Sequence, residues 1–338
     1  MDWGHRQRTK FWLGLGLSLV LVGGWVWAHL QPVGSPDRHV RIEVPPGTTF
    51  SEVADRLAAK HLIRSKWVFL WVGRLTGAER RILPGEYDIH GGMTAMDIIH
   101  HLVHGQVVQH LVTIPEGYSV RQIAELLARK RLTDRNTFLR LTVDPEFIHT
   151  LGLQVSSLEG YLFPDSYLLT RFMEPEIIIR RMVERLHHVW TPERRARARE
   201  LGMSLHEVLT LASVIEKETG DPTERGLISG VFHNRLRRQI PLQSDPTVIY
   251  AIKEFDGNLR KSDLRIESPY NTYRVTGLPP GPIANPGEAA IHAALYPAST
   301  PFMYFVSRND GSHHFSRTLA EHQRAVQKYQ LGPFRRSS

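Results

Sequence analysis

The 338-residue sequence contains no cysteine, so it can form neither a disulfide nor a thiolate metal site. It also lacks the HExxH pattern of helical zinc sites. Of its 18 histidines, only His100, His101 and His104 cluster on a predicted helix, and they have no acidic partner at a suitable spacing. We therefore predict no metal and no cofactor.

Acidic residues are fewer than basic ones, with 34 Asp and Glu against 42 Lys and Arg, a net charge of +8. Such a balance favours anionic partners: nucleic acid, lipid head groups or an acidic polymer. The length is sufficient for two folded domains and an anchor.

Formal charge is absent from the twenty residues 11–30, FWLGLGLSLVLVGGWVWAHL. About 20 apolar residues span a bilayer as a helix, and tryptophans near both ends suit the two interfaces. Basic residues before the span favour a cytoplasmic N-terminus (residues 1–10) with the rest of the chain outside. The alternative is a signal peptide cleaved after Val26-Trp27-Ala28, but the apolar run exceeds the usual core of about 7–15 residues.

An internal repeat follows, in which residues 42–62 (IEVPPGTTFSEVADRLAAKHL) match residues 112–132 (VTIPEGYSVRQIAELLARKRL) at a constant shift of 70 positions. Each copy predicts a strand, a Pro-x-Gly turn, an N-cap at Thr49 or Ser119, and an amphipathic helix. A strand over 83–89 and a helix over 93–103 are predicted between the copies. The strand-helix-helix-strand order of 40–89 resembles a LysM carbohydrate-binding module, and a plain α+β spacer is the alternative.

Residues 205–220 (LHEVLTLASVIEKETG) predict a helix that starts with the capping box Ser204–Glu207 and ends before Pro222. On a helical wheel Glu216 lies about 20° from Leu205, within the apolar face, whereas Glu207 and Glu218 point the other way. Burial without a cation raises the pKa of a carboxyl and prepares it to act as a general acid. The alternative is that Glu216 caps a loop or pairs with an arginine.

The second half of the chain carries several irregular segments. Residues 158–169 (LEGYLFPDSYLL) are too irregular for one helix, and Asp245 followed by Pro246 predicts a helix start. The loop 268–287 has seven prolines or glycines among its last eleven residues, which is typical of an ordered functional loop. Residues 302–306 and 313–316 predict a β-hairpin.

Taken in order, these motifs resemble the YceG-like, MltG-type endolytic murein transglycosylases of bacterial inner membranes, over most of residues 40–329. The motifs are LEGYLFPDSYLL, ASVIEKETG, VFHNRL, PLQSDPTVIYAI, SPYNTYRVTGLPPGPIANPG and YFVSRNDGSHHFSRTLAEH. The resemblance implies an α+β fold: a transmembrane helix, a small LysM-like α+β domain, and a mainly helical α+β catalytic domain with a β-hairpin.

The family's chemistry would be cleavage of the MurNAc-β-1,4-GlcNAc bond of nascent peptidoglycan by a carbon-oxygen lyase, leaving 1,6-anhydroMurNAc ends and terminating strand elongation. The catalytic acid implied is the first glutamate of the EKE tripeptide, Glu216. One carboxyl suffices, because the nucleophile belongs to the substrate, whereas glycoside hydrolases need two.

A binding shell is expected around this acid. Its candidate members are Gln243, Ser244, Asp245, Asn271, Thr272, Tyr273, Glu159 and Tyr161, with Asp165, Phe163, Arg235 and Arg274 as further candidates. Capping is the alternative role of Asp245, and core packing that of Tyr161 and Phe163.

We thus predict a cytoplasmic segment 1–10, a transmembrane helix 11–30, a LysM-like domain 40–110, a catalytic domain 111–332 whose first part, 111–150, is a connecting repeat, and a loose tail 333–338. The expected location is the bacterial inner membrane, as a single-pass protein with its catalytic domain outside the cytoplasm. Expected partners are glycan strands and penicillin-binding synthases, not nucleic acid. The alternative function is a catalytically silent, membrane-anchored peptidoglycan-binding scaffold.

Overall fold

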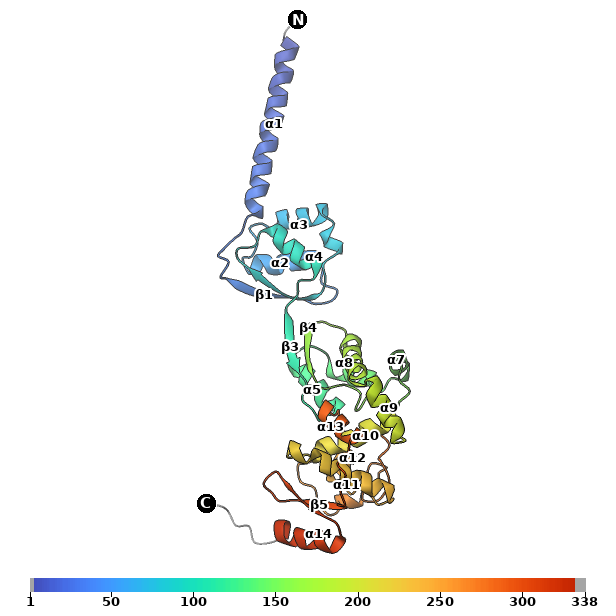
Figure 1. Ribbon diagram of the computed structural model, residues 1–338. Coiled ribbons are helices and arrows are strands. Elements are labelled where there is room, and N and C mark those ends of the chain that lie inside the picture. The colour runs from blue at the N-terminus through green and yellow to red at the C-terminus, as the bar shows by residue number, and fades with distance from the viewer. Residues whose placement is uncertain (1–2, 332–338) are drawn as a thin grey trace. The chain divides into compact units, whose positions relative to one another are not determined.

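The computed structural model describes residues 3–331, and it divides into two compact units. Unit 1 contains the chain up to Leu111 together with Leu168–Met173, and unit 2 contains Val112–Tyr167 and the chain from Glu174 onward (Figure 1). The domains predicted from the sequence were consecutive segments, so they did not include this return of Leu168–Met173 to unit 1. The predicted loose tail 333–338 and the first two residues lie outside the described part.

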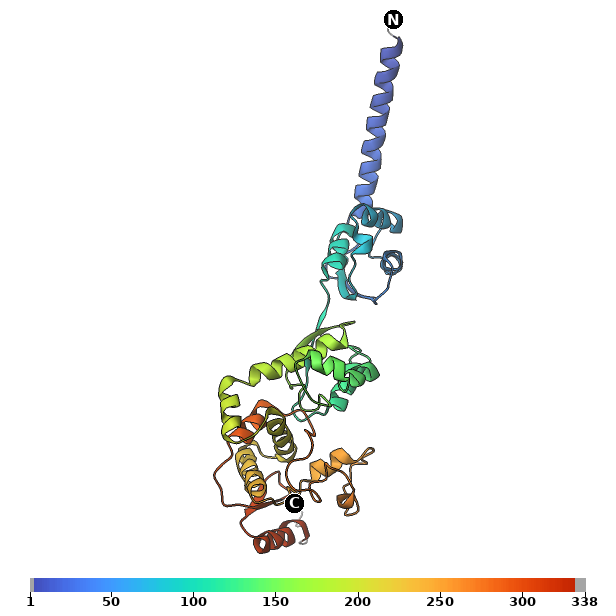
Figure 2. The same ribbon diagram turned by 90° about the vertical axis from the view of Figure 1, so that its right-hand side faces the viewer.

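Unit 1 begins with the long helix α1 (Trp3–Leu30), which projects from the rest of the unit in both views (Figure 1, Figure 2). Its segment Lys10–Leu30 is long and apolar enough to cross a membrane, and no residue of its most apolar 18-residue window is buried within the protein. This is consistent with a single-pass membrane anchor.

The body of unit 1 is a small α+β structure. Its elements are β1 (His39–Val44), α2 (Phe50–Ala59), α3 (Lys66–Leu75), the 3₁₀ turn η1 (Ala78–Arg80), β2 (Gly85–His90) and α4 (Ala95–His104). Strands β1 and β2 are antiparallel, with Ile42 opposite Tyr87. The strand-helix-helix-strand order predicted for 40–89 is therefore present, while its LysM-like character stays a prediction.

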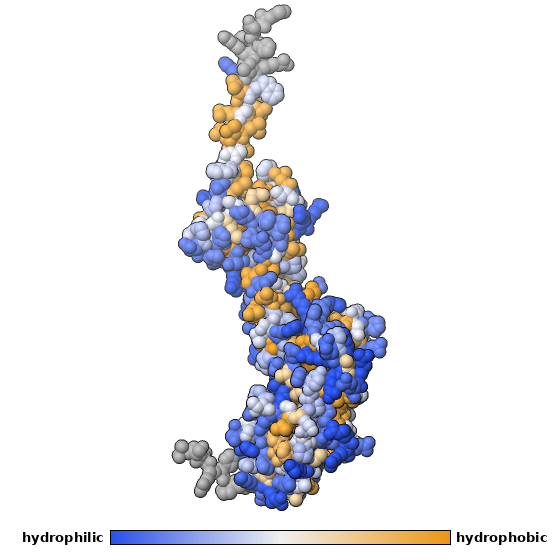
Figure 3. All heavy atoms as spheres, in the orientation of Figure 1, coloured by the Kyte–Doolittle hydropathy of each residue, from blue (hydrophilic) through white to orange (hydrophobic). Residues whose placement is uncertain are grey.

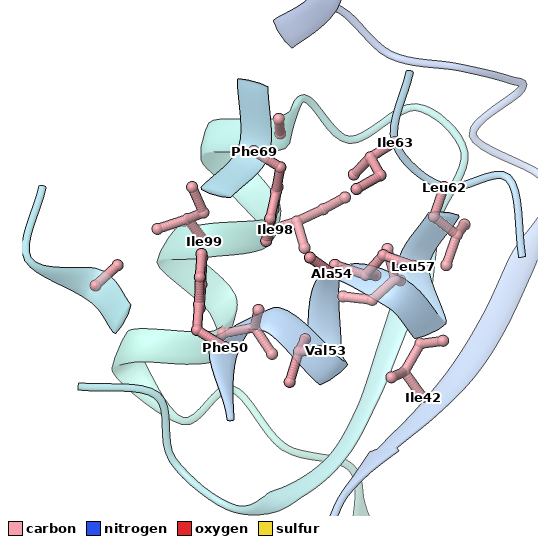
Figure 4. Close-up of a cluster of buried hydrophobic side chains, with 14 of the residues drawn as sticks. Ile42, Phe50, Val53, Ala54, Leu57, Leu62, Ile63, Phe69, Ile98 and Ile99 are labelled. Atoms are coloured by element: carbon pink, nitrogen blue, oxygen red, sulfur yellow. The ribbon is translucent and has the colours of Figure 1, made fainter. Parts of the chain in front are cut away.

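A hydrophobic core joins the helices of unit 1 to one face of this sheet (Figure 4). Val53 and Leu57 of α2, Phe69 of α3 and Ile98 of α4 are 1% exposed or less. The Phe50 and Phe69 rings stack at 5.0 Å, which fixes α3 against α2. Each such side chain contributes about 1.5–3 kcal/mol by leaving water.

Unit 2 is mainly helical. It is entered through β3 (Gln109–Thr113), which pairs with β4 (Ser166–Thr170). Its helices are α5 (Val120–Arg129), α6 (Arg135–Leu141), α7 (Pro145–Thr150), α8 (Pro175–Val189), α9 (Pro192–Glu200), α10 (Leu205–Glu218), α11 (Arg225–Arg237), α12 (Asp245–Ala251), α13 (Glu288–Leu295) and α14 (Leu319–Val326), with short 3₁₀ turns η2 (Pro222–Glu224) and η3 (Asp263–Arg265) and a π turn η4 (Gln327–Leu331). The predicted hairpin is β5 (Tyr304–Ser307) and β6 (His313–Ser316), paired antiparallel.

Helix α10 is the centre of unit 2. It contacts α9, α11, α12 and α13, and its residues from Val208 to Ile215 are all buried. It begins at the predicted capping box, where Ser204 accepts from the Glu207 N–H and the Glu207 carboxylate accepts from the Ser204 N–H. Because α10 is buried on every side, a helical wheel drawn from its sequence cannot tell which side chains at its end are enclosed.

The two repeat copies have the same local structure in different surroundings. Thr49 of the first and Ser119 of the second both form capping boxes. Gly47 and Gly117 both have positive φ, 80° and 72°, as their turns require. A Cβ on Gly47 would meet open space, whereas one on Gly117 would lie 3.4 Å from Cγ of Glu216. The second turn thus packs against the C-terminal end of α10.

Candidate active site

Both glutamates of the EKE tripeptide are taken out of bulk water at the end of α10, which differs from the sequence-based expectation. Glu218 was expected to face solvent, and this is wrong. It lies one and two turns after Val214 and Leu211, which are fully buried on the side of the helix opposite Leu205. That spacing is the signal by which the sequence could have revealed it.

Glu218 is buried beside a serine hydroxyl. The Ser244 hydroxyl donates to its Oε1 at 2.5 Å. Burial raises the pKa of this carboxyl to about 7, and the nearby charge of Asp245 adds to the rise, while the Ser244 hydrogen bond and Arg235 oppose it. A carboxyl with this pKa is substantially protonated near neutral pH and can both donate and accept a proton.

Glu218 opens on a cavity of about 290 Å³. Three residues of the predicted binding shell, Gln243, Asp245 and Tyr273, line it together with Glu218. The Tyr273 hydroxyl donates to Oδ1 of Asp245 at 2.6 Å, and burial raises the Tyr273 pKa. The predicted cap role of Asp245 is wrong: the N-cap of α12 is Ser244, and the Asp245 carboxylate faces the cavity.

The other predicted shell residues nearby act as internal supports. Thr272 accepts the Gln243 N–H at its carbonyl, at 3.0 Å, and the Ser244 N–H at its hydroxyl, at 3.0 Å. Asn271 donates to the carbonyls of Leu264 and Ile266. Both side chains are fully buried, so they position the cavity wall. Gln243 is held at φ 51°, an uncommon conformation for a residue with a side chain and one that clusters at functional sites.

Arg235 lines the cavity with most of its guanidinium already used. It donates to the carbonyl oxygens of Met303 at 2.7 Å and Leu242 at 2.8 Å, and it stacks over the Tyr304 ring at 4.9 Å. These contacts hold Arg235, a further candidate for the binding shell, in place within the cavity wall. Arg274 is exposed and lies 3.5 Å from Oε1 of Glu267.

Glu216 occupies a different environment, on the side of α10 that faces α13. Its Oε2 accepts the Gly287 N–H at 3.0 Å, and Nη2 of Arg225 lies 3.5 Å from its Oε1. Its side chain is 9% exposed. The expectation of burial without a cation is wrong, and the alternative role, capping a loop and pairing with an arginine, is the one that the contacts show. Its catalytic role stays a prediction.

A second acid, Glu116 of the repeat turn, lies beside this cluster. Burial and the charge of Glu216 raise the Glu116 pKa, whereas Arg225 opposes the rise. Glu116 and Arg225 line a cavity of about 660 Å³ with Glu288 and His292. Charges of both signs meet here, so Glu216 belongs to an ion-pair cluster.

Glu159 and Tyr161, also predicted for the binding shell, lie elsewhere in unit 2. Glu159 accepts the Val120 N–H at 3.0 Å and Nδ2 of Asn285 at 3.2 Å, and burial raises its pKa to about 7. It lines a separate cavity of about 720 Å³. Tyr161 is buried, and its hydroxyl lies 2.9 Å from Nδ1 of His206.

Two further predicted residues have structural partners. Asp165 pairs with Arg185 at 2.5 Å, and the same guanidinium stacks over Phe163 at 5.7 Å. Through Glu159, the LEGYLFPD segment bonds both Asn285 of the loop 268–287 and Val120 in the first turn of α5. No residue of this segment lines the Glu218 cavity.

Sequence reasoning missed the part that the hairpin plays. Phe305 and His313 of the hairpin line the Glu218 cavity, and so does His322 of α14. Nδ1 of His313 lies 2.7 Å from Oε2 of Glu224, and burial lowers the His322 pKa, which keeps that ring neutral near pH 7. Only the YFVSRNDGSHHF motif signalled this contribution. Within residues 3–331 no three metal-ligating side chains converge.

A model of the YceG-like family matches residues 42–328 of the chain. An endolytic murein transglycosylase of Bacillus subtilis (strain 168) is 33% identical over 333 residues, covering 92% of this chain and 91% of that protein. One of Streptococcus pneumoniae serotype 2 (strain D39 / NCTC 7466) is 28% identical over 351 residues; the match covers 93% of this chain and 63% of that longer protein.

A solved structure gives the same result for the fold. The crystal structure of a putative yceG-like protein from Listeria monocytogenes is 32% identical, superposes with a TM-score of 0.60, and covers 85% of this chain and 98% of that one. The resemblance inferred from the ordered motifs is thereby confirmed, and the chain belongs to the YceG-like family.

Proposed function

We propose that this protein is an endolytic murein transglycosylase, which cleaves the MurNAc-β-1,4-GlcNAc bond within nascent peptidoglycan strands, leaves 1,6-anhydroMurNAc ends and so terminates strand elongation. The names of the two relatives support the substrate and the reaction class. The observation that carries the proposal is the carboxyl of Glu218, with its pKa near 7, on a cavity shared with Asp245 and Tyr273.

In this mechanism Glu218 acts first as acid and then as base. Its proton goes to the GlcNAc O4 oxygen as the bond from muramic C1 to O4 breaks. The muramic 6-hydroxyl oxygen then bonds to C1, and its proton returns to the Glu218 carboxylate. No water is consumed, so a second carboxyl to activate water is not needed. Donation and recovery of one proton suit a group whose pKa lies near the working pH.

Asp245 and Tyr273 take supporting roles in the proposal. Cleavage passes through an oxocarbenium-like centre, which a fixed negative charge stabilises. The carboxylate of Asp245, oriented by the Tyr273 hydroxyl at 2.6 Å, supplies that charge. The Gln243 amide is placed to bond sugar hydroxyl or acetamido groups, because it lines the same cavity.

Glu216 remains the alternative acid, since the family resemblance implied it. Its contacts favour a structural role, because its two carboxyl oxygens face the Gly287 N–H and the Arg225 guanidinium.

The location follows from the anchor. With residues 1–10 in the cytoplasm, α1 would hold both units outside it, at the inner membrane, where nascent strands are made. Penicillin-binding synthases are the partners that such a site would serve. A reporter fused after Ser338 should then be active only outside the cytoplasm.

Product analysis tests the reaction. The full chain, in detergent, is incubated with glycan strands free of stem peptides, and the ends formed are identified by mass spectrometry. We expect 1,6-anhydro ends from internal cuts. Reducing ends would indicate a hydrolase, and unchanged strands bound by folded protein would indicate the scaffold; either result overturns the proposal.

A further inference from the structure

Helix α3 of unit 1 carries an apolar stripe that the protein leaves uncovered. Trp67, Trp71 and Leu75, spaced four residues apart, are 79%, 55% and 66% exposed. Residues at i, i+4 and i+8 lie along one face of a helix. The opposite face is core: Val68, Phe69 and Val72 are buried. Two exposed tryptophans on one short helix form an apolar patch that takes no part in the packing of unit 1.

This helix adjoins the membrane anchor. α3 contacts α1, and Val26 and Leu30 of α1 pack against the unit 1 core. Arg64, just before the Ser65 N-cap of α3, donates through Nη2 to the Pro32 carbonyl at 2.8 Å. The first residues after the apolar span are thus tied to the start of α3. In both views α3 lies at the end of the unit 1 body that α1 joins (Figure 1, Figure 2).

Hydrophobic surface occurs both on α1 and on the unit 1 body next to it. Figure 3 shows orange surface along α1 and again at the end of the unit 1 body that α1 joins, with paler surface between the two. The span Lys10–Leu30 reaches the residues that pack on the unit 1 core, so this end of the unit must stand at head-group depth if α1 crosses the bilayer.

We propose that α3 is an interfacial helix, whose Trp67–Trp71–Leu75 stripe inserts into the outer surface of the same bilayer that α1 spans. Tryptophan prefers this depth, where its ring meets acyl chains and its N–H meets water. The stripe, together with α1, would hold unit 1 flat on the membrane at two points. An anchor of one helix alone would let it swing.

The basic residues near the stripe favour anionic phospholipid as the surface into which it inserts. Arg74 of α3, Arg80 of the 3₁₀ turn η1 that follows it and Arg81 just after that turn are exposed, and Arg74 lies 3.7 Å from Glu79. Each basic side chain near an anionic bilayer adds about 1 kcal/mol of attraction. A protein partner is less consistent with the position of the stripe beside the anchor, and a glycan would have to reach the tryptophans at the membrane surface.

The absence of cysteine makes the test direct, because a single introduced thiol gives a single label. The full chain is made as Trp67→Cys, Trp71→Cys and Asp88→Cys, each spin-labelled and reconstituted in vesicles of phosphatidylethanolamine and phosphatidylglycerol. Asp88 is the control, since it is exposed on β2 of the same unit. Collision with oxygen, which partitions into lipid, and with a water-soluble nickel chelate is measured by paramagnetic resonance.

We expect the ratio of oxygen to nickel accessibility at positions 67 and 71 to exceed that at 88 several-fold. The ratio should fall in the Trp67→Cys protein when Trp71→Glu is added, without a change in thermal midpoint, because both side chains are exposed. Three results would overturn the proposal: nickel access equal to that at 88, exclusion of both reagents, which marks a protein interface, and protection only when glycan strands are added.

Discussion

Two carboxyl groups two positions apart, at the end of a single helix, lie in different chemical surroundings. Glu216 accepts the Gly287 N–H and lies 3.5 Å from the Arg225 guanidinium. Glu218 accepts a hydrogen bond from the Ser244 hydroxyl, and burial, with a smaller contribution from the charge of Asp245, raises its pKa to about 7. The difference shows that two acids on one helix can take different roles, because the segments packed around each of them differ.

The largest expected effect is on turnover. Glu218→Gln should lower kcat by about 10²–10⁴-fold, because the amide keeps the shape but has no proton to give. Glu216→Gln, its matched control on the same helix, should cost less than tenfold. The rates are measured on isolated glycan strands by release of new ends. If the two variants exchange these results, Glu216 is the acid and the comparison above is reversed.

The next effect is on stability and should be confined to the Glu216 side. Glu216→Gln removes a charged acceptor from the Gly287 N–H and leaves Arg225 without its partner, so the free energy of unfolding should fall by about 1–3 kcal/mol. Glu218→Gln at pH 8 should instead leave it unchanged or raised, since it removes a carboxylate whose ionisation burial disfavours. Urea denaturation of both variants measures this. Equal losses would mean that both carboxyls serve the fold.

The smallest effect concerns pH. The acid is active when protonated, so kcat/KM should fall as pH rises above about 7, the pKa of Glu218. Asp245 raises that pKa and the Ser244 hydrogen bond lowers it. Asp245→Asn should therefore move the falling limb to lower pH, and Ser244→Ala should move it to higher pH. Shifts in the same direction, or a limb fixed in both variants, would assign the pH dependence to another group.

Much of the local structure could be predicted because its causes are local. The N-caps at Thr49 and Ser119, the capping box at Ser204 and the hairpin depend on residues a few positions apart, and all are present. The start of α12 was misplaced by one residue: Asp245 lies within the helix and accepts the Tyr273 hydroxyl, and Ser244, at the N-cap, donates its hydroxyl to Glu218.

The candidate site was predictable as a set of motifs and not as an arrangement. Gln243, Asp245 and Tyr273 do line one cavity, but Glu159 and Tyr161 lie elsewhere, bonded to α5, the 268–287 loop and His206. Some residues of these ordered motifs line the cavity and others make structural contacts away from it. The order of the motifs in the sequence does not show which residues do which.

The sequence by itself determined the apolar anchor, the repeat, the boundaries of α10 and the family, since each follows from composition, spacing or an ordered set of motifs. Only the tertiary structure decided what surrounds each glutamate. α10 is packed on every side, and the groups around Glu216 and Glu218, which are Arg225, Gly287, Ser244 and Asp245, are brought together from distant positions. A helical wheel contains none of those neighbours, and it cannot show the burial that raises the Glu218 pKa.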